Sequence, residues 1–346
     1  MSLYEYRPAR YILKNYMKRF LSTLGKLLVT AGIIWYIVQK LGWTAISATM
    51  GSARPEWLVV TAAVFFISNC IGAFQWQILL KNKGIDLSYA KSLRMYFIGM
   101  FFSNFIFGMA AAAAVRVTYL KLGKSSGKAG FAATFLDRFA GLIAMLAFAV
   151  VGSILLLKQK AIESRSLDIA LIAVLCTFGL LLGLLALIVS TRLQKLFFSL
   201  LSKSPLPTTV KEGLSSLIAE VILESHDRHV IMPVASLSVC IQFLRIGGNI
   251  TCAAALGLLT VTNAHYFFIF VPMLALLMIV PLPFGVREGV GGTLFTMAGF
   301  HPQAAFIMGF LSSIVGIIVT LPGGLLFIAK RRSAVSHEVV HSHSAT

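Results

Sequence analysis

The hydrophobic and polar positions of this chain alternate in long blocks rather than at short intervals. Six apolar runs approach or exceed the roughly 20 residues that cross a bilayer as a helix. They are residues 27–41, 57–80, 130–157, 169–189, 230–259 and 304–329. Each run is flanked by polar or basic residues. The pattern predicts an all-α, polytopic membrane protein with about six full spans.

Two further apolar stretches are predicted to enter the membrane and return on the same side. Residues 95–115 are long enough to cross, but Arg116 and three lysines follow them with no acid between. Because Lys and Arg favour the cytoplasmic side, a re-entrant hairpin keeps both flanks inside. A plain span, the alternative, places this basic cluster outside.

The second stretch, residues 265–300, is interrupted at 281–292 by two prolines and four glycines. Broken helix at membrane depth is tolerated only where it is packed in protein or lines a wet cavity. We therefore expect a second hairpin, entering from the outer side, which makes the two hairpins opposed. The alternative is an ordinary loop at the membrane surface.

These segments suggest a domain organisation. Residues 1–23 alternate basic with aromatic or aliphatic positions, which is typical of an interfacial amphipathic helix. Residues 24–332 form a single transmembrane domain, and the polar tail 333–346 is expected to be disordered. The domain divides into halves 24–157 and 158–332 with the same order of spans and hairpin. Three crossings per half make the second half inverted, which is an arrangement of transporters.

Composition supports a membrane protein and argues against nucleic acid as a partner. The 346 residues are 58% hydrophobic and only 12% charged, and the net charge is +18. The basic residues mostly flank apolar runs, where they orient spans and attract anionic headgroups. Their distribution predicts that both termini lie on the cytoplasmic side. No cofactor or metal is expected, since the four cysteines lack metal-ligand spacing.

Ionisable residues inside the apolar stretches are the candidate binding residues. They are Arg116, Asp137, Arg138, Arg245, Arg287 and Glu288. A charge at membrane depth costs roughly 3 kcal/mol on insertion scales and is usually functional. Arginine binds phosphate bidentately, and four arginines against two acids favour an anionic group such as a lipid phosphate. A helix that begins near Val286 adds its N-terminal partial positive charge.

Structural roles remain open for the same residues. Arg116 can anchor a helix end at the surface, and Glu288 can stabilise the first turn of its helix. Asp137 and Arg138 are sequence neighbours, which do not face each other on a helix, so each is expected to need a partner elsewhere. Arg245 shares one helical face with Gln242 and Asn249, a set that can also act as interhelical polar glue.

Three motifs resemble one known family. They are SN at 103–104 with AAVR at 113–116 and YL at 119–120, FLDRFAGL at 135–142, and PFGVREG at 283–289. Together they resemble the flippase-like integral membrane domain at the N-terminus of lysylphosphatidylglycerol synthases, whose stand-alone relatives are linked to hopanoid and glycolipid pathways. The resemblance covers most of residues 20–330. Relatives usually show Gly-Gly-Asp before the arginine, where this chain has a run of alanines.

The resemblance implies translocation of a polar- or phosphate-headgroup lipid between leaflets, with no aminoacyl-transferase domain expected. The sequence shows no catalytic motif, so we predict a transporter that binds anionic lipids rather than an enzyme. Two other functions stay open. One is an integral membrane transferase using a polyprenyl-linked or lipid donor. The other is a non-transporting subunit that holds a lipid-modifying enzyme at the membrane. The oligomeric state is not predicted.

Overall fold

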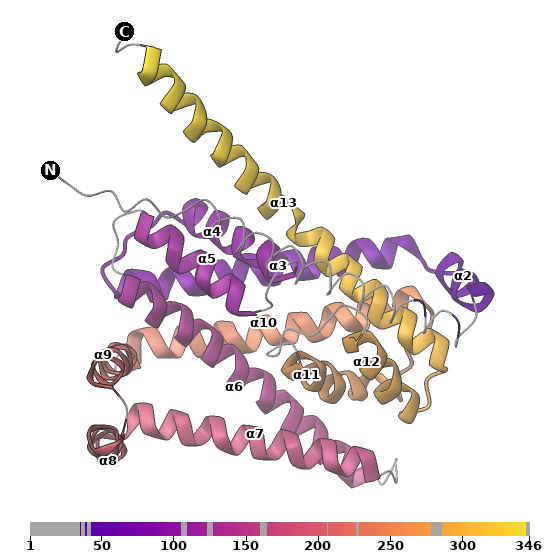
Figure 1. The fold of residues 1–346 in the computed structure, drawn as a ribbon. Helices are drawn as coiled ribbons and strands as arrows, with labels where there is room; N and C mark the ends of the chain where they lie inside the picture. The colour runs from indigo at the N-terminus through magenta and orange to yellow at the C-terminus, as the bar shows by residue number, and fades with distance from the viewer. Residues whose placement is uncertain are drawn as a thin grey trace, which may run out of the picture.

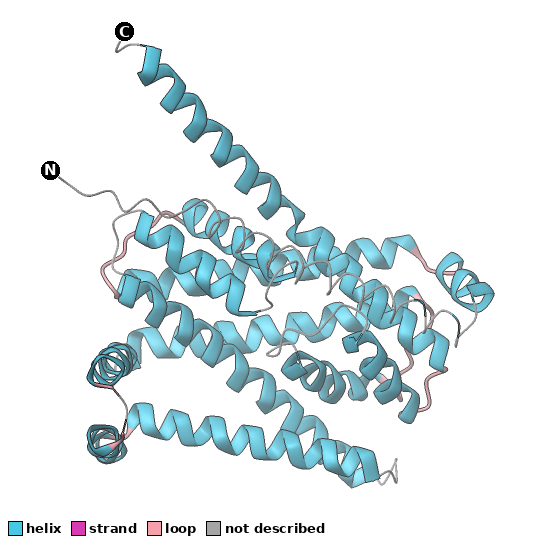
Figure 2. Cartoon of the chain, in the orientation of Figure 1, coloured by secondary structure: helices cyan, strands magenta, loops and turns pink. Residues whose placement is uncertain are grey.

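The fold is all-α and is described by a computed structural model. It covers residues 43–104, 109–122, 127–159, 165–205, 207–225, 228–277 and 286–343, together with Trp35 and Gln39. Figure 2 shows helices joined by short loops over this part of the chain, with no strand. The helices are α2 (Trp43–Gly51), α3 (Pro55–Asn82), α4 (Tyr89–Phe102), α5 (Met109–Leu122), α6 (Gly127–Gln159), α7 (Arg165–Val189), α8 (Thr191–Lys203), α9 (Thr208–Ser225), α10 (Arg228–Ala255), the 3-10 helix η2 (Ala264–Tyr266), α11 (Phe267–Leu277), α12 (Val286–Met297) and α13 (Pro302–His343).

Four described helices are long and apolar enough to cross a bilayer. They are Pro55–Asn82, Gly127–Ile154, His229–Ala255 and Pro302–Ala329. These correspond to four of the six predicted spans, so the prediction of an all-α polytopic membrane protein is confirmed. The predicted run 27–41 and the amphipathic segment 1–23 lie outside the described residues, apart from Trp35 and Gln39.

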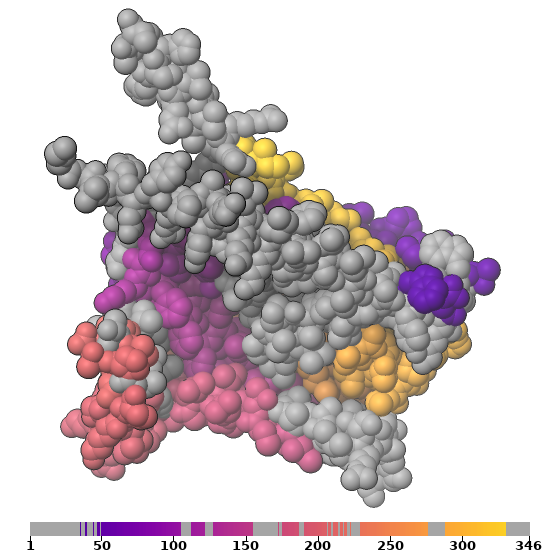
Figure 3. Space-filling view, in the orientation of Figure 1, coloured from indigo at the N-terminus to yellow at the C-terminus, as the bar shows by residue number. Residues whose placement is uncertain are grey.

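The predicted run 169–189 lies within α7. A pair of segments, Leu175–Ala186 and Thr191–Lys203, bends by 94° between α7 and α8. A helix at right angles to a span lies along the membrane plane. In α8, Leu193, Leu196 and Leu200 are exposed on one side, which suits an interfacial helix. Figure 3 shows α8 and α9 at one corner of the molecule.

Both predicted hairpins are pairs of short helices. Since an α-helix rises 1.5 Å per residue, the 14 residues of α4 or of α5 extend only about 21 Å, too little for a hydrocarbon core of about 30 Å. α11 and α12, with 11 and 12 residues, are shorter still. In Figure 1 the α4–α5 pair lies towards the end of the bundle where α9 is found, and α11 and α12 lie towards the opposite end. The stretch 95–115 therefore contributes to two short helices that pack against each other, and its return to the same side of the membrane stays a prediction.

Each hairpin packs against a long helix of the other half as well as its own. α4 contacts α13, whereas α11 contacts α6. α5 then contacts α6, and α12 contacts α13, while α3 and α10 lie against each other in the middle. Such packing of each hairpin against the opposite half is what two inverted halves would produce. The repeat itself, and the division at residue 157, remain predictions.

The end of α13 differs from the prediction for the tail. The structure continues this helix to His343, where the polar composition from residue 333 predicts disorder. A helix that is already formed adds residues without a new nucleation cost, so a span can extend into a polar segment that has no helical signal of its own.

α13 approaches the first hairpin at Gly323. A Cβ atom added there would meet the backbone carbonyl of Phe97 in α4 at less than any real contact distance. Small residues allow this close approach of two membrane helices. We expect Gly323→Ala to lower the free energy of unfolding by about 1–3 kcal/mol because α4 must move, measured by SDS titration in mixed micelles. Gly316→Ala on the same helix meets no atom within 4 Å, and a comparable loss in that control would contradict the explanation.

Candidate functional site

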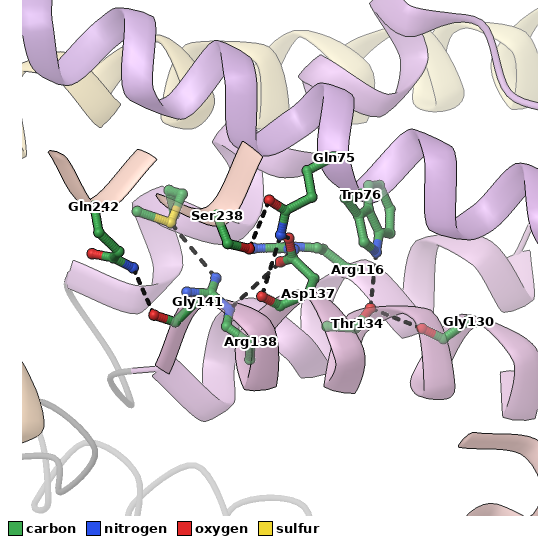
Figure 4. A network of polar contacts seen from close by, with 11 residues as sticks. Gln75, Trp76, Arg116, Gly130, Thr134, Asp137, Arg138, Gly141, Ser238 and Gln242 are labelled. Atoms are coloured by element: carbon green, nitrogen blue, oxygen red, sulfur yellow. Dashed lines mark hydrogen bonds and ion pairs between the residues drawn. The ribbon is translucent and has the colours of Figure 1, made fainter. Parts of the chain in front are cut away.

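The first polar centre of the bundle is Asp137, which α6 carries between α3, α5 and α10. Its side chain is 5% exposed. Gln75 of α3 donates from Nε2 to Oδ1 of Asp137 at 3.1 Å, and Ser238 of α10 donates to Oε1 of Gln75 at 3.0 Å. Figure 4 shows this chain of hydrogen bonds. The carboxylate is therefore held in one orientation by side chains from two other helices.

Arg116 of α5 lies against the other oxygen of this carboxylate. Its side chain is 0% exposed, and Nη1 donates to Oδ2 of Asp137 at 3.0 Å. The guanidinium carbon lies 4.1 Å from the ring centre of Tyr96 and 5.4 Å from that of Trp76, a cation–π arrangement. Among the described residues, Nε and Nη2 of Arg116 have no hydrogen-bond partner. Full burial excludes the alternative that Arg116 anchors a helix end at the surface.

Arg138 lies on the same side of the carboxylate as Arg116. Its Nε is 4.0 Å from Oδ2 of Asp137, and Nη2 lies 3.8 Å from the sulfur of Met100 in α4. The expectation that each of the two neighbours needs a partner elsewhere is confirmed, because Asp137 pairs with Arg116 and Arg138 contacts Met100. The arginine stem in addition brings Nε of Arg138 back towards the carboxylate of Asp137. The distance leaves Nε of Arg138 without a hydrogen bond in the described part of the chain.

Arg245 of α10 completes the group. Its guanidinium interacts electrostatically with Tyr96, Arg138 and Asp137. Two arginines therefore contact one aspartate, and a third, from α10, lies within electrostatic range of it. We call Arg116, Asp137, Arg138 and Arg245 the arginine cluster. Its formal charge is +2, and its first and last members, Arg116 and Arg245, lie 129 positions apart in the sequence.

The two other polar residues predicted on the face of α10 have a different role. Gln242 donates to the carbonyl oxygen of Gly141 in α6 at 3.0 Å. Asn249 donates to the carbonyl oxygen of Arg245 at 2.8 Å and accepts from Ser312 of α13 at 2.8 Å. Both side chains therefore join helices together, as the polar-glue alternative expects.

Glu288 forms a second polar group, on the second hairpin. It is buried in α12 and accepts a hydrogen bond from Ser313 of α13. With Asn249 it lines a cavity of about 20 Å³, which is room for one water molecule. The structure therefore groups Arg116, Asp137, Arg138 and Arg245 and places Glu288 in a separate polar group. Arg287 lies in the first turn of α12, but its side chain is outside what the structure describes.

The sequence did not identify several uncharged residues that lie around the arginine cluster. Gln75, Tyr96, Trp76 and Ser238 all lie in apolar runs and carry no charge. Gln75 has one usable signal, since it is an amide within the predicted span 57–80 and a polar side chain inside a membrane needs a partner. No comparable signal marks the two aromatic residues, which any span contains.

Thr134 supports the cluster through Trp76. Its hydroxyl accepts from Nε1 of Trp76 at 3.0 Å and donates to the carbonyl oxygen of Gly130 at 2.8 Å. Replacing Thr134 with Val leaves the buried indole N–H unpaired, so we expect a loss of about 1–3 kcal/mol in unfolding free energy. Thr118→Val is the control, because the exposed Thr118 makes the same intrahelical bond and no other described contact. Equal losses in both variants would contradict this role for Thr134.

Metal chemistry has no described basis. Within the residues that the structure places, no group of three or more His, Cys, Asp or Glu side chains is arranged to hold a metal ion. The three arginines of the cluster are hydrogen-bond donors, and such a group of guanidinium side chains can bind an oxyanion.

Comparison with known proteins gives two matches. The profile of the family described as Lysylphosphatidylglycerol synthase TM region matches residues 23–325. The UPF0104 membrane protein PH1989 of Pyrococcus horikoshii is 26% identical over 344 residues, which covers 90% of this chain and 98% of the relative. No solved structure matches significantly.

Proposed function

Because this chain belongs to the family of the lysylphosphatidylglycerol synthase TM region and is an integral membrane protein, we propose that it moves a lipid between the two leaflets of a bilayer. The lipid carries a phosphate-bearing or otherwise polar headgroup. In this proposal the protein is a transporter rather than an enzyme, and it works in a bacterial inner membrane with both termini in the cytoplasm. The observation that supports it is the arginine cluster with its single carboxylate.

The charge of the cluster favours an anionic ligand. Each arginine at membrane depth costs about 2.5–3.5 kcal/mol on insertion scales. One aspartate neutralises only one of the three, so a formal charge of +2 remains inside the bundle. A phosphate group brought to this place supplies the missing negative charge. Few uncharged headgroups would compensate the same cost.

The hydrogen-bonding capacity of the cluster supports the same ligand. Buried donors are nearly always paired in native proteins. Nε and Nη2 of Arg116 and Nε of Arg138 are buried without a hydrogen-bond partner in the described residues. Phosphate oxygens accept several such bonds at once, and arginine presents its donors in a matching fork.

The second hairpin adds two residues to the proposal. Arg287 and Glu288 belong to the first turn of α12, where the helix N-terminus attracts anions. In this proposal Arg287 binds the lipid headgroup when the lipid is nearer the leaflet on the side of the second hairpin. Glu288 and Asp137 balance the arginines and receive any cationic substituent.

Access to the cluster requires movement of the first hairpin. Since Arg116 is completely buried, a headgroup reaches it only if α4 and α5 separate from α6. Tyr96 and Met100, which cover the two arginines Arg116 and Arg138, both lie on α4. Alternating movement of the two opposed hairpins would expose the site to each leaflet in turn, while the acyl tails stay in lipid.

A sidedness assay tests the proposal. The purified protein is placed in sealed proteoliposomes that contain fluorescent phosphatidylglycerol labelled on an acyl chain, and an impermeant quencher reports the outer leaflet. We expect protein-dependent exchange between leaflets that is much slower for a matched lipid with an uncharged headgroup. Exchange no faster than in protein-free vesicles would contradict translocation. Conversion of the lipid into a new product in detergent would instead favour the transferase alternative.

A further inference from the structure

A second feature of the bundle, an apolar groove on α3, is not used by the arginine cluster. The groove encloses about 460 Å³ and is lined by Phe66, Ile67, Cys70, Ile71, Phe74, Tyr89 and Leu237. Five of these residues belong to α3, with one from α4 and one from α10. Phe66, Ile67 and Phe74 are 45%, 49% and 46% exposed, so the groove opens outwards.

We propose that this groove holds an acyl chain of an anionic phospholipid whose headgroup lies against Lys81. The proposal rests on the proposed function, because it places the tail of a lipid next to the cluster. The occupant is a phospholipid in the leaflet nearest the C-terminal end of α3.

The surroundings of the groove favour a hydrocarbon chain as its occupant. α3 and α10 are both long enough and apolar enough to cross a membrane, so an outward-facing groove between them faces the bilayer core. The one phenol in the lining is already paired, since the hydroxyl of Tyr89 donates to the carbonyl oxygen of Cys70 at 3.1 Å. An apolar cavity that offers no polar partner does not retain water. A lipid tail is the occupant that the bilayer supplies.

The positive charge of Lys81 at one end of the groove favours a lipid with an anionic headgroup. Lys81 follows Phe74 by seven residues, which is two helical turns, so it lies on the same face about 10 Å further along α3. Lys81 is exposed in the last turn of the helix. The nearby segment 81–94 holds four basic residues and one acid. A lipid aligned with its tail between Phe66 and Phe74 therefore has a phosphate within reach of an ammonium group.

The groove is also close to the cluster in the chain. Phe74 immediately precedes Gln75, which donates to Asp137, and Leu237 immediately precedes Ser238, which donates to Gln75. The same two helices thus present apolar side chains outwards and the polar network inwards. A lipid in the groove lies one helix away from the site that would receive its headgroup.

Photo-crosslinking tests this site without any transport step. Phosphatidylglycerol with a diazirine in one acyl chain is added to the full-length protein in nanodiscs of phosphatidylcholine and phosphatidylglycerol, and labelled peptides are mapped by mass spectrometry. We expect residues 66–74 to take most of the label. Cys70→Trp, which fills the groove, should reduce that label at least fivefold, and Ile67→Trp is a second filling variant if the first does not fold.

The control is Cys240→Trp, at an exposed cysteine of α10 that does not line the groove, and it should leave the label unchanged. Lys81→Glu should reduce labelling by phosphatidylglycerol but not by the phosphatidylcholine analogue. Even labelling of exposed positions such as Met232 and Phe243, or full labelling after the groove is filled, would overturn the proposal. The crosslinking readout measures binding alone, so the two proposals can fail separately. Labelling without leaflet exchange would count against the proposed function but support the groove as a lipid site. Leaflet exchange without labelling would support the proposed function and contradict the groove as a lipid site.

Discussion

Asp137→Asn is expected to lower the free energy of unfolding by about 3–5 kcal/mol, the largest stability effect of any single substitution proposed for this bundle. Asparagine keeps an oxygen that can accept from Gln75 but loses the negative charge. Three guanidinium groups, of which that of Arg116 is fully buried, then lie close together without a counter-ion. Removing one partner of a buried ion pair is strongly destabilising because the other charge is left uncompensated. SDS titration in mixed micelles measures the change.

Two controls separate charge from general damage. Glu56→Gln removes an exposed acid from the first turn of α3 and should cost less than about 1 kcal/mol. The double variant Asp137→Asn with Arg116→Met should recover part of the loss, since it removes one of the uncompensated charges. If Asp137→Asn proved as stable as the parent protein, the arginines would have to be neutralised by other groups, and the cluster as described would be wrong.

Arg116→Met is expected to reduce leaflet exchange about 10- to 100-fold while leaving the protein at least as stable. Methionine fills a similar apolar volume beside Tyr96 and Trp76. The excess charge of the cluster falls by one, so folding is not penalised. The ligand, however, loses the donors of Arg116, and hydrogen bonds to charged groups are each worth about 1.5–3 kcal/mol. The proteoliposome sidedness assay measures the rate.

Arg192→Met is the matched control, because Arg192 is an exposed arginine on α8. It should exchange lipid at the parental rate. A normal rate in Arg116→Met would show that the buried guanidinium is structural, and the non-transporting subunit would then become the better explanation of the fold. A low rate together with a large loss of stability would point to a folding role instead.

The hairpins show how far local sequence signals reach. Basic residues on both sides of 95–115 predicted a return to the same side, and the break between α4 and α5 agrees with that prediction. Prolines and glycines at 281–292 predicted a break in the second stretch, and α11 ends before it. Both signals are local, since they depend on charge asymmetry and on backbone restrictions of a few residues.

The arginine cluster shows where those signals stop. The sequence identified Arg116, Asp137, Arg138 and Arg245 as unusual because a charge in an apolar run is visible without a fold. It grouped them with Glu288, which the structure assigns to another helix pair beside Ser313. It expected Arg138 to have a partner elsewhere, which Met100 provides, but not that the side chain would also reach back towards Asp137.

By itself, the sequence determined that this protein is an α-helical membrane protein, and it marked the charged residues that such a protein rarely buries. Hydrophobic run length, prolines and flanking charges act along the chain, so they can be interpreted without knowing what lies opposite. Only the tertiary structure decided which charges share one environment, because pairing depends on helix packing between residues far apart in sequence. Two uncharged residues, Gln75 and Ser238, orient Asp137 through a chain of hydrogen bonds. For the same reason, only the tertiary structure could identify them.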